Sequence, residues 1–114
     1  MTQEEYELLL KDLCARLPYT VIIKSVGENK IIGLWDLRDI DNLPLPYLRP
    51  MESMTEEEKE EIKTYLRSIE GQLLGDNGRH IWYFDYLNAH HFDYRKLIEK
   101  GLAIEAPKDM YNYE

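Results

Sequence analysis

Two helix-start signals of the same form divide this chain and limit what it can fold into. The segments that begin at Thr2 and Thr55 both read S/T-x-x-E, the pattern of a capping box in which a hydroxyl and a carboxylate satisfy backbone amides of the first turn. Apolar residues at helical spacing follow each signal. Stop signals come at Pro18 and at Gly71. A helix is therefore predicted at both places.

The apolar stripe of the first predicted helix includes the one cysteine of the chain. The stripe consists of Tyr6, Leu9, Leu10, Leu13, Cys14 and Leu17. This position predicts that Cys14 is a buried small hydrophobe and not a reactive thiol. A single cysteine cannot form an internal disulfide, and the first residues show no export signal. Both observations predict a cytoplasmic protein.

The region between the two helices has no helical periodicity. Residues 19–26 and the start of 30–37 are rich in β-branched side chains, and the glycine and asparagine of 27–29 favour a turn between them, so a β-hairpin is predicted. Residues 38–53 contain Pro44, Pro46 and Pro50 but remain too apolar for a linker. We expect an ordered, extended segment across the core, with a short helical turn near Ile40–Leu43.

The C-terminal third has weaker signals. Residues 72–78 are predicted as a turn-rich break, and 81–90 fit either a short strand or, as we favour, a helix, because no turn signal separates Phe84 from Leu87. Residues 93–101 indicate one or two helical turns, and 102–106 a closing strand. The fold prediction is a single α+β domain over 1–107, with a tail at 108–114. The predicted core comprises Leu9, Leu13, Val21, Ile23, Ile32, Leu34, Ile62, Leu66, Leu87 and Leu97.

The charge balance excludes several kinds of partner. The 22 acidic and 14 basic side chains give a net charge of −8, and the longest charge run, at 56–61, is acidic. Direct binding to nucleic acid or to an anionic membrane surface is disfavoured, because both require clustered lysine and arginine. No apolar run is long enough to cross a bilayer. The acidity fits either plain solubility or an acidic surface that docks on a basic partner or mimics nucleic acid.

The segment from Asn88 to Arg95 is the one place where a metal site suggests itself. His90 and Asp93 could meet at a backbone break, with Asp85 or His80 as a third ligand, but adjacent histidines on a helix point about 100° apart. The competing interpretation is a structural corner, in which Asp93 caps the next turn, Phe92 points inward and His90 and His91 lie at the surface. No nucleotide-binding or nucleophile motif occurs anywhere in the chain. We expect no cofactor and no catalytic residue.

Nine tyrosines and two tryptophans are many for 114 residues. Both residue types are enriched at protein interfaces, because they combine apolar area with a polar tip. The densest group predicts a protein-contact surface at Trp82, Tyr83, Tyr86 and Tyr94.

Two long stretches also carry a resemblance. Residues 45–58, LPYLRPMESMTEEE, and 87–107, LNAHHFDYRKLIEKGLAIEAP, resemble an uncharacterised family of small proteins common in gut Bacteroides-type genomes, often in prophage-like regions. The likeness covers most of the chain and implies a phage or mobile-element origin. It implies no activity, cofactor or catalytic residue.

The sequence thus predicts a small acidic protein without enzymatic activity that acts by binding another protein, and self-association stays open. One alternative is a metal-dependent hydrolase or nuclease that uses His90 and Asp93. A second alternative is an acidic inhibitor that mimics nucleic acid.

Overall fold

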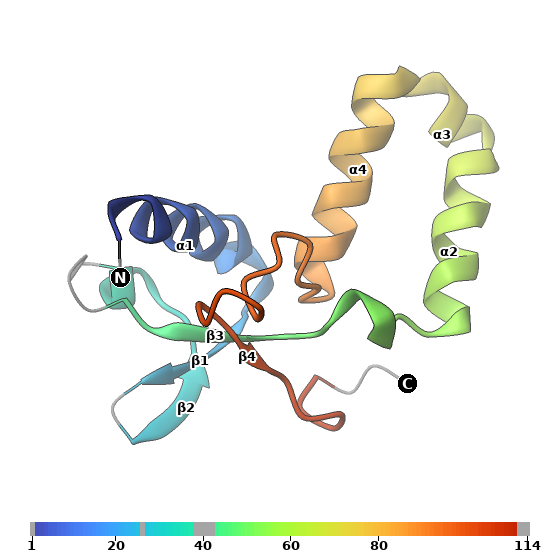
Figure 1. Cartoon of the computed structure of the whole chain (residues 1–114). Helices are drawn as coiled ribbons and strands as arrows, with labels where there is room; N and C mark the ends of the chain where they lie inside the picture. The colour runs from blue at the N-terminus through green and yellow to red at the C-terminus, as the bar shows by residue number, and fades with distance from the viewer. Residues whose placement is uncertain (1, 26, 38–42, 112–114) are drawn as a thin grey trace.

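The structure, a computed structural model, describes residues 2–25, 27–37 and 43–111, without the side chains of Ser25, Leu34 and Trp35. It has the predicted α+β fold, with helices and one mixed sheet (Figure 1). The helices and strands are α1 (Gln3–Arg16), β1 (Ile22–Ser25), β2 (Glu28–Ile31), β3 (Leu45–Leu48), α2 (Glu56–Arg67), α3 (Ile69–Leu73), α4 (Gly75–Ala89) and β4 (Ile104–Glu105).

The first helix begins where the sequence predicts. The Thr2 hydroxyl accepts a hydrogen bond from the Glu5 amide at 3.1 Å, and the Glu5 carboxylate accepts one from the Thr2 amide at 2.9 Å. The prediction that Cys14 is buried is wrong, because this residue is exposed. The buried face runs instead through Leu9, Asp12, Leu13 and Arg16, an i, i+3, i+4, i+7 set with two charged members. The buried face was predicted wrongly because the prediction counted only apolar residues and so left out Asp12 and Arg16.

The described strands form a sheet in the order β2-β1-β3-β4. The predicted hairpin is confirmed, but its strands are shorter and its turn is earlier, since Ser25 pairs with Glu28 and Gly27 has a φ of +78°. Residues 34–37, predicted to be strand, form a 3₁₀ turn. The Asp36 carboxylate accepts a hydrogen bond from the Gly33 amide at 2.7 Å, and this local cap ends the strand pattern.

The proline-rich segment crosses the core as predicted, and part of it becomes strand β3. This strand lies between β1, to which it is antiparallel, and β4, to which it is parallel. Its central residues Pro46, Tyr47 and Leu48 are all buried. The helical turn predicted near Ile40–Leu43 falls largely on residues 38–42, outside the described part of the chain.

The core lies between α1 and the sheet and agrees closely with the prediction. The predicted core residues that are buried are Leu9, Leu13, Val21, Ile23, Ile32, Ile62, Leu87 and Leu97. Leu66 is only half-buried, and the side chain of Leu34 is not described. Phe92, Leu48 and Leu102 are further buried members.

Helices α2, α3 and α4 form an arch that rises from the sheet (Figure 1). We call residues 56–89 the arch and the remaining described residues the body. The radius of gyration is 15.1 Å, whereas a compact domain of this length is expected near 13 Å. The arch accounts for this elongated shape.

The break predicted over 72–78 is present but much shorter, since α3 ends at Leu73, α4 begins at Gly75, and Gly75 has a φ of +71°. The first change of direction comes earlier, at Ser68, whose hydroxyl accepts a hydrogen bond from the Gly71 amide at 3.1 Å. Gly71, predicted to stop the helix, lies inside α3, where a side chain would collide with the carbonyl oxygen of Tyr65. The preferred helix over 81–90 is confirmed, and it begins six residues earlier than its signal.

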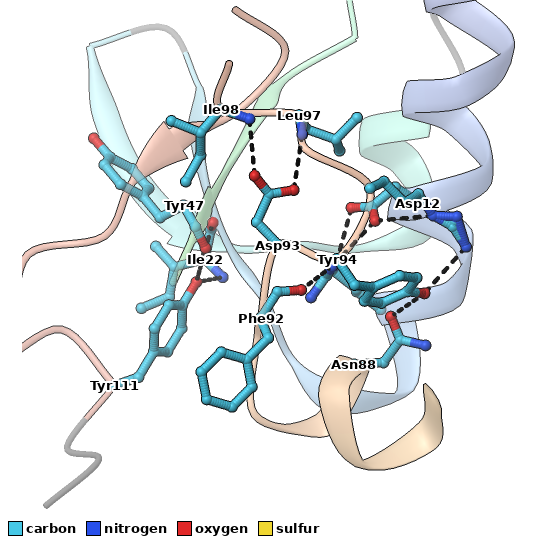
Figure 2. Close-up of polar contacts among 12 residues, drawn as sticks. Asp12, Ile22, Tyr47, Asn88, Phe92, Asp93, Tyr94, Leu97, Ile98 and Tyr111 are labelled. Carbon is cyan, nitrogen blue, oxygen red and sulfur yellow. Dashed lines mark hydrogen bonds and ion pairs between the residues drawn. The ribbon is translucent and has the colours of Figure 1, made fainter. Parts of the chain in front are cut away.

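After α4 the chain returns to the body through turns. The helical turns predicted over 93–101 are absent, and His91 and Lys96 both have positive φ values, of 64° and 59°. The predicted closing strand is present but short, as β4. Tyr111, in the predicted tail, is half-buried, and its hydroxyl accepts from the Ile22 amide at 2.9 Å and donates to the Tyr47 carbonyl at 2.7 Å (Figure 2). Residues 112–114 lie outside the description.

Candidate protein-contact site

The corner at 88–95 places two of the candidate metal ligands, His90 and Asp93, against protein partners. The Asp93 carboxylate accepts hydrogen bonds from the amides of Leu97, at 2.8 Å, and Ile98, at 3.0 Å (Figure 2). His90 Nδ1 lies 3.2 Å from a carboxylate oxygen of Glu58. Within the described residues, no three histidine, cysteine or acidic side chains are grouped to hold a metal ion. The carboxylate of Asp93 therefore serves the backbone, as the corner interpretation predicts.

The corner is anchored by Phe92, which is fully buried, as predicted. Its ring lies beneath the Arg49 guanidinium, 4.1 Å from centroid to carbon, and its carbonyl accepts a hydrogen bond from Arg16. Backbone bonds of 2.8 Å join the Arg49 amide to the His91 carbonyl and the Asp93 amide to the Arg49 carbonyl. These bonds hold the segment before α2 and the segment after α4, which we call the two feet of the arch, side by side.

The two histidines of the corner differ in burial. His90 stacks on Tyr86 and stays half-buried, whereas His91 is only 8% exposed and stacks on Tyr111 at 3.9 Å. The expectation that His91 lies at the surface is wrong. Burial, with the positive charge of Arg16 next in importance, lowers the pKa of His91 to about 4, so this ring is neutral at physiological pH.

Two buried ion networks that the sequence analysis missed support the corner. Arg16 pairs with Asp12 at 2.8 Å, and both side chains are fully buried. Arg95 also reaches Asp12, at 3.3 Å, and lies over the Tyr94 ring. The one available signal was the i, i+4 spacing of Asp12 and Arg16 on a helix.

The second network joins the body to the foot of α2. Arg49 donates to both carboxylate oxygens of Glu58, at 2.7 and 2.8 Å. Burial alone would raise the pKa of Glu58, but hydrogen bonds from Arg49 and Thr55 hold it below its ordinary value. Glu58 is thus both the predicted capping residue and the partner of a buried arginine.

Three of the four aromatic residues predicted as one contact surface, Trp82, Tyr83 and Tyr86, lie on α4, and Tyr94 lies beyond its end. Trp82 and Tyr86 face α2, where the Trp82 ring stacks on Tyr65 with centroids 4.0 Å apart and the Tyr86 hydroxyl donates to Glu61 at 3.0 Å. Tyr83 lines a hollow of about 430 Å³ together with Ile62, Leu66, Asp76, Arg79 and His80.

Tyr94 belongs to the body, and its hydroxyl donates a hydrogen bond to Asn88 of α4 at 2.9 Å (Figure 2). Its ring contacts Phe84, also of α4. The four side chains are half-buried. The predicted surface is therefore divided between the side of α4 that faces α2 and the body.

Exposed apolar side chains gather instead on the arch. Six large apolar side chains are exposed in the described part of the chain, and five of them belong to the arch: Ile69, Leu73, Leu74, Ile81 and Phe84. Leu73 is 81% exposed and Ile69 77%. Single exposed apolar residues are ordinary on protein surfaces, but a concentration of them on one projecting element is typical of a contact site.

An open groove of about 910 Å³ lies where α2 meets α3. Tyr65 and Ile69 contribute its apolar side chains, and glutamates supply all of its charged ones. The groove is lined by Glu56, Glu57, Glu60, Glu61, Thr64, Tyr65, Ser68, Ile69 and Glu70. We call it the acid-rimmed groove.

Comparison of the chain with protein-family models, with curated proteins and with solved structures gives no match. None of the helices in the described ranges combines the length and the apolar character needed to span a membrane.

Proposed function

We propose that this protein is a non-enzymatic, cytoplasmic accessory factor that binds another protein through its arch. The observation that carries this proposal is the gathering of exposed apolar side chains on α3 and α4, far from the core. Burying such side chains against a partner is favourable at roughly 25 cal/mol per Å². A phage or mobile-element setting, implied by the resemblance of 45–58 and 87–107, belongs to the same proposal.

The arch is built to hold a fixed shape. Stacked rings run from Tyr65 through Trp82 and Tyr86 to His90, with successive centroids 4.0, 5.5 and 4.1 Å apart. His90 then meets Glu58, which is paired with a buried arginine of the body. A surface already ordered in the free protein loses less entropy on binding.

One observation supports the acidic-inhibitor alternative as well. The glutamates of α2 and α3 gather around one groove, as a nucleic-acid mimic would require. The apolar centre of that groove favours a protein-binding site of mixed character over a purely charged mimic.

Site-specific photo-crosslinking in host-cell extract tests the proposal. A photoreactive amino acid replaces Leu73 or Ile81 on the arch or, as the control, exposed Lys11 on α1. We expect the same adduct from both arch positions and none from the control. An excess of the protein without the photoreactive amino acid should compete for the partner and suppress the adduct. The same excess of the variant Leu73→Asp/Ile81→Asp should not suppress it. Adducts that form equally from all three positions, or from none, would contradict binding through the arch.

A further inference from the structure

We propose that the acid-rimmed groove holds a basic amphipathic segment of the partner protein, with an apolar side chain on Tyr65 and Ile69 and cationic side chains on the glutamate rim. This inference rests on the proposed function and names the chemistry of the partner. It concerns the groove where α2 meets α3, which is lined by neither Leu73 nor Ile81, the positions used in the crosslinking experiment.

The first step is the apolar centre of the groove. Ile69 is 77% exposed although it is a large aliphatic residue, and no described side chain covers it. Tyr65 lies beside it, held flat by its stack on Trp82, with an interplanar angle of 8°. An apolar side chain from a partner would bury both surfaces at once.

The second step is charge complementarity. Glu56, Glu57, Glu60, Glu61 and Glu70 surround this centre, and no lysine or arginine lines the groove. Two of these glutamates have weak partners on α2, since Lys59 lies 3.2 Å from Glu56 and Lys63 lies 3.9 Å from Glu60. Exposed ion pairs of this kind contribute little to stability, so a partner's cation can replace the lysine at small cost. A cationic partner would gain from the whole rim, because clustered charge of one sign attracts its opposite.

The same arrangement disfavours other occupants. A second copy of this chain would bring another strongly acidic molecule, of net charge −8, against the rim. Nucleic acid and anionic lipid would be repelled for the same reason. A purely cationic ligand would leave Ile69 uncovered. An amphipathic basic helix or peptide satisfies both the apolar centre and the acidic rim.

Fluorescence anisotropy with defined peptides tests the inference. The first probe is a labelled 14-residue amphipathic helix of leucine and lysine. The second has the same composition in an order that breaks the amphipathic face, and the third is oligolysine. We expect the amphipathic helix to bind about tenfold more tightly than either control peptide.

Two matched triple variants locate the binding. Glu57→Gln/Glu60→Gln/Glu70→Gln removes three charges from the groove, and Glu4→Gln/Glu7→Gln/Glu99→Gln removes three exposed charges from the body. We expect the groove variant to weaken binding about tenfold and the body variant less than about twofold. Ile69→Ser should weaken the amphipathic helix and leave oligolysine unchanged.

Equal weakening by both triple variants would show attraction to net charge alone and overturn the inference. So would oligolysine that binds as tightly as the amphipathic helix, because the apolar centre would then have no role. These failures leave the proposed function standing as long as crosslinking from Leu73 and Ile81 succeeds. Failure of the crosslinking removes the proposed function itself.

Discussion

The body and the arch distribute their charged and apolar side chains in opposite ways. In the body, Asp12, Arg16 and Arg49 are fully buried, and each meets an oppositely charged group at hydrogen-bonding distance. In the arch, Leu73 and Ile81 are exposed, at 81% and 63%. Buried charges that are already paired inside the molecule act on stability, whereas uncovered apolar groups become useful only against a partner. The difference assigns stability to the buried pairs of the body and fits the proposal that the arch contacts a partner.

The largest effect on stability is expected at the corner that joins the two regions. Phe92→Ala should lower the free energy of unfolding by about 3–5 kcal/mol, because it empties a fully buried aromatic site. Denaturant unfolding measures the change. His90→Ala, a half-buried neighbour, is the matched control and should cost less than about 1 kcal/mol. A His90→Ala variant as destabilised as Phe92→Ala would contradict the interpretation that Phe92 anchors the corner.

Removing one partner of a buried charge pair should come next. Asp12→Ala leaves the fully buried Arg16 without its carboxylate, and we expect a loss of about 3 kcal/mol. The estimate lies at the low end of the usual range because Arg16 keeps its bond to the Phe92 carbonyl. The double variant Asp12→Leu/Arg16→Met, which removes both charges, should recover most of the loss in thermal unfolding. A double variant as unstable as Asp12→Ala would show that the pair itself, not the orphaned charge, matters.

The buried ring of His91 should make the body sensitive to acid. Because its pKa is lowered from 6.5 to about 4, the unfolded chain binds this proton more readily than the folded one. Its contribution to stability is therefore complete above pH 6.5 and falls as the pH drops towards 4. At pH 4 the loss should be on the order of 3 kcal/mol.

The variant His91→Asn isolates this effect, because asparagine tolerates the positive φ of the position and does not titrate in this range. Denaturant unfolding between pH 7 and 4 should show a shallower decline in the variant than in the natural chain. Parallel pH curves would mean that His91 is already accessible to protons in the folded state.

The smallest effect on stability is expected on the exposed face of the arch. Leu73→Ser and Ile81→Ser should each change the free energy of unfolding by less than about 0.5 kcal/mol while reducing partner crosslinking. Ile62→Ala, a buried residue of the same arch, is the contrasting variant and should cost about 2 kcal/mol. Large destabilisation by the serine variants would show that these side chains pack within the molecule after all.

The sequence predicted best what depends on neighbours along the chain. Both capping boxes began helices, because the hydroxyl and carboxylate that satisfy the first turn lie within three residues of each other. The buried side of α1 was misassigned, since the burial of Arg16 depends on a carbonyl 76 residues away, at Phe92. No local pattern contains that information.

The same reason explains the errors in the arch and at the candidate site. Glycine and asparagine over 75–78 favour a turn in isolation, yet only Gly75 has a positive φ, and the segment forms the first turn of α4, whose rings stack against α2. The aromatic-rich stretch was recognised from composition, but which of its rings face α2 depends on how α2 and α4 pack. The acid-rimmed groove requires the change of direction at Ser68. This turn depends on a single hydroxyl, which a pattern of apolar residues does not reveal.

The clamp between Arg49 and the corner has a consequence for chain connectivity. Because the two feet of the arch are bonded to each other, the arch is a closed insertion between the neighbouring parallel strands β3 and β4. Replacing the arch by a shorter loop across the same feet would change the entropic cost of closing the chain only slightly, since that cost depends weakly on loop length. The obstacle to such a graft is Arg49, whose carboxylate partner Glu58 would leave with the arch. A replacement of the arch should therefore keep the fold only when Arg49 is replaced at the same time by an uncharged residue.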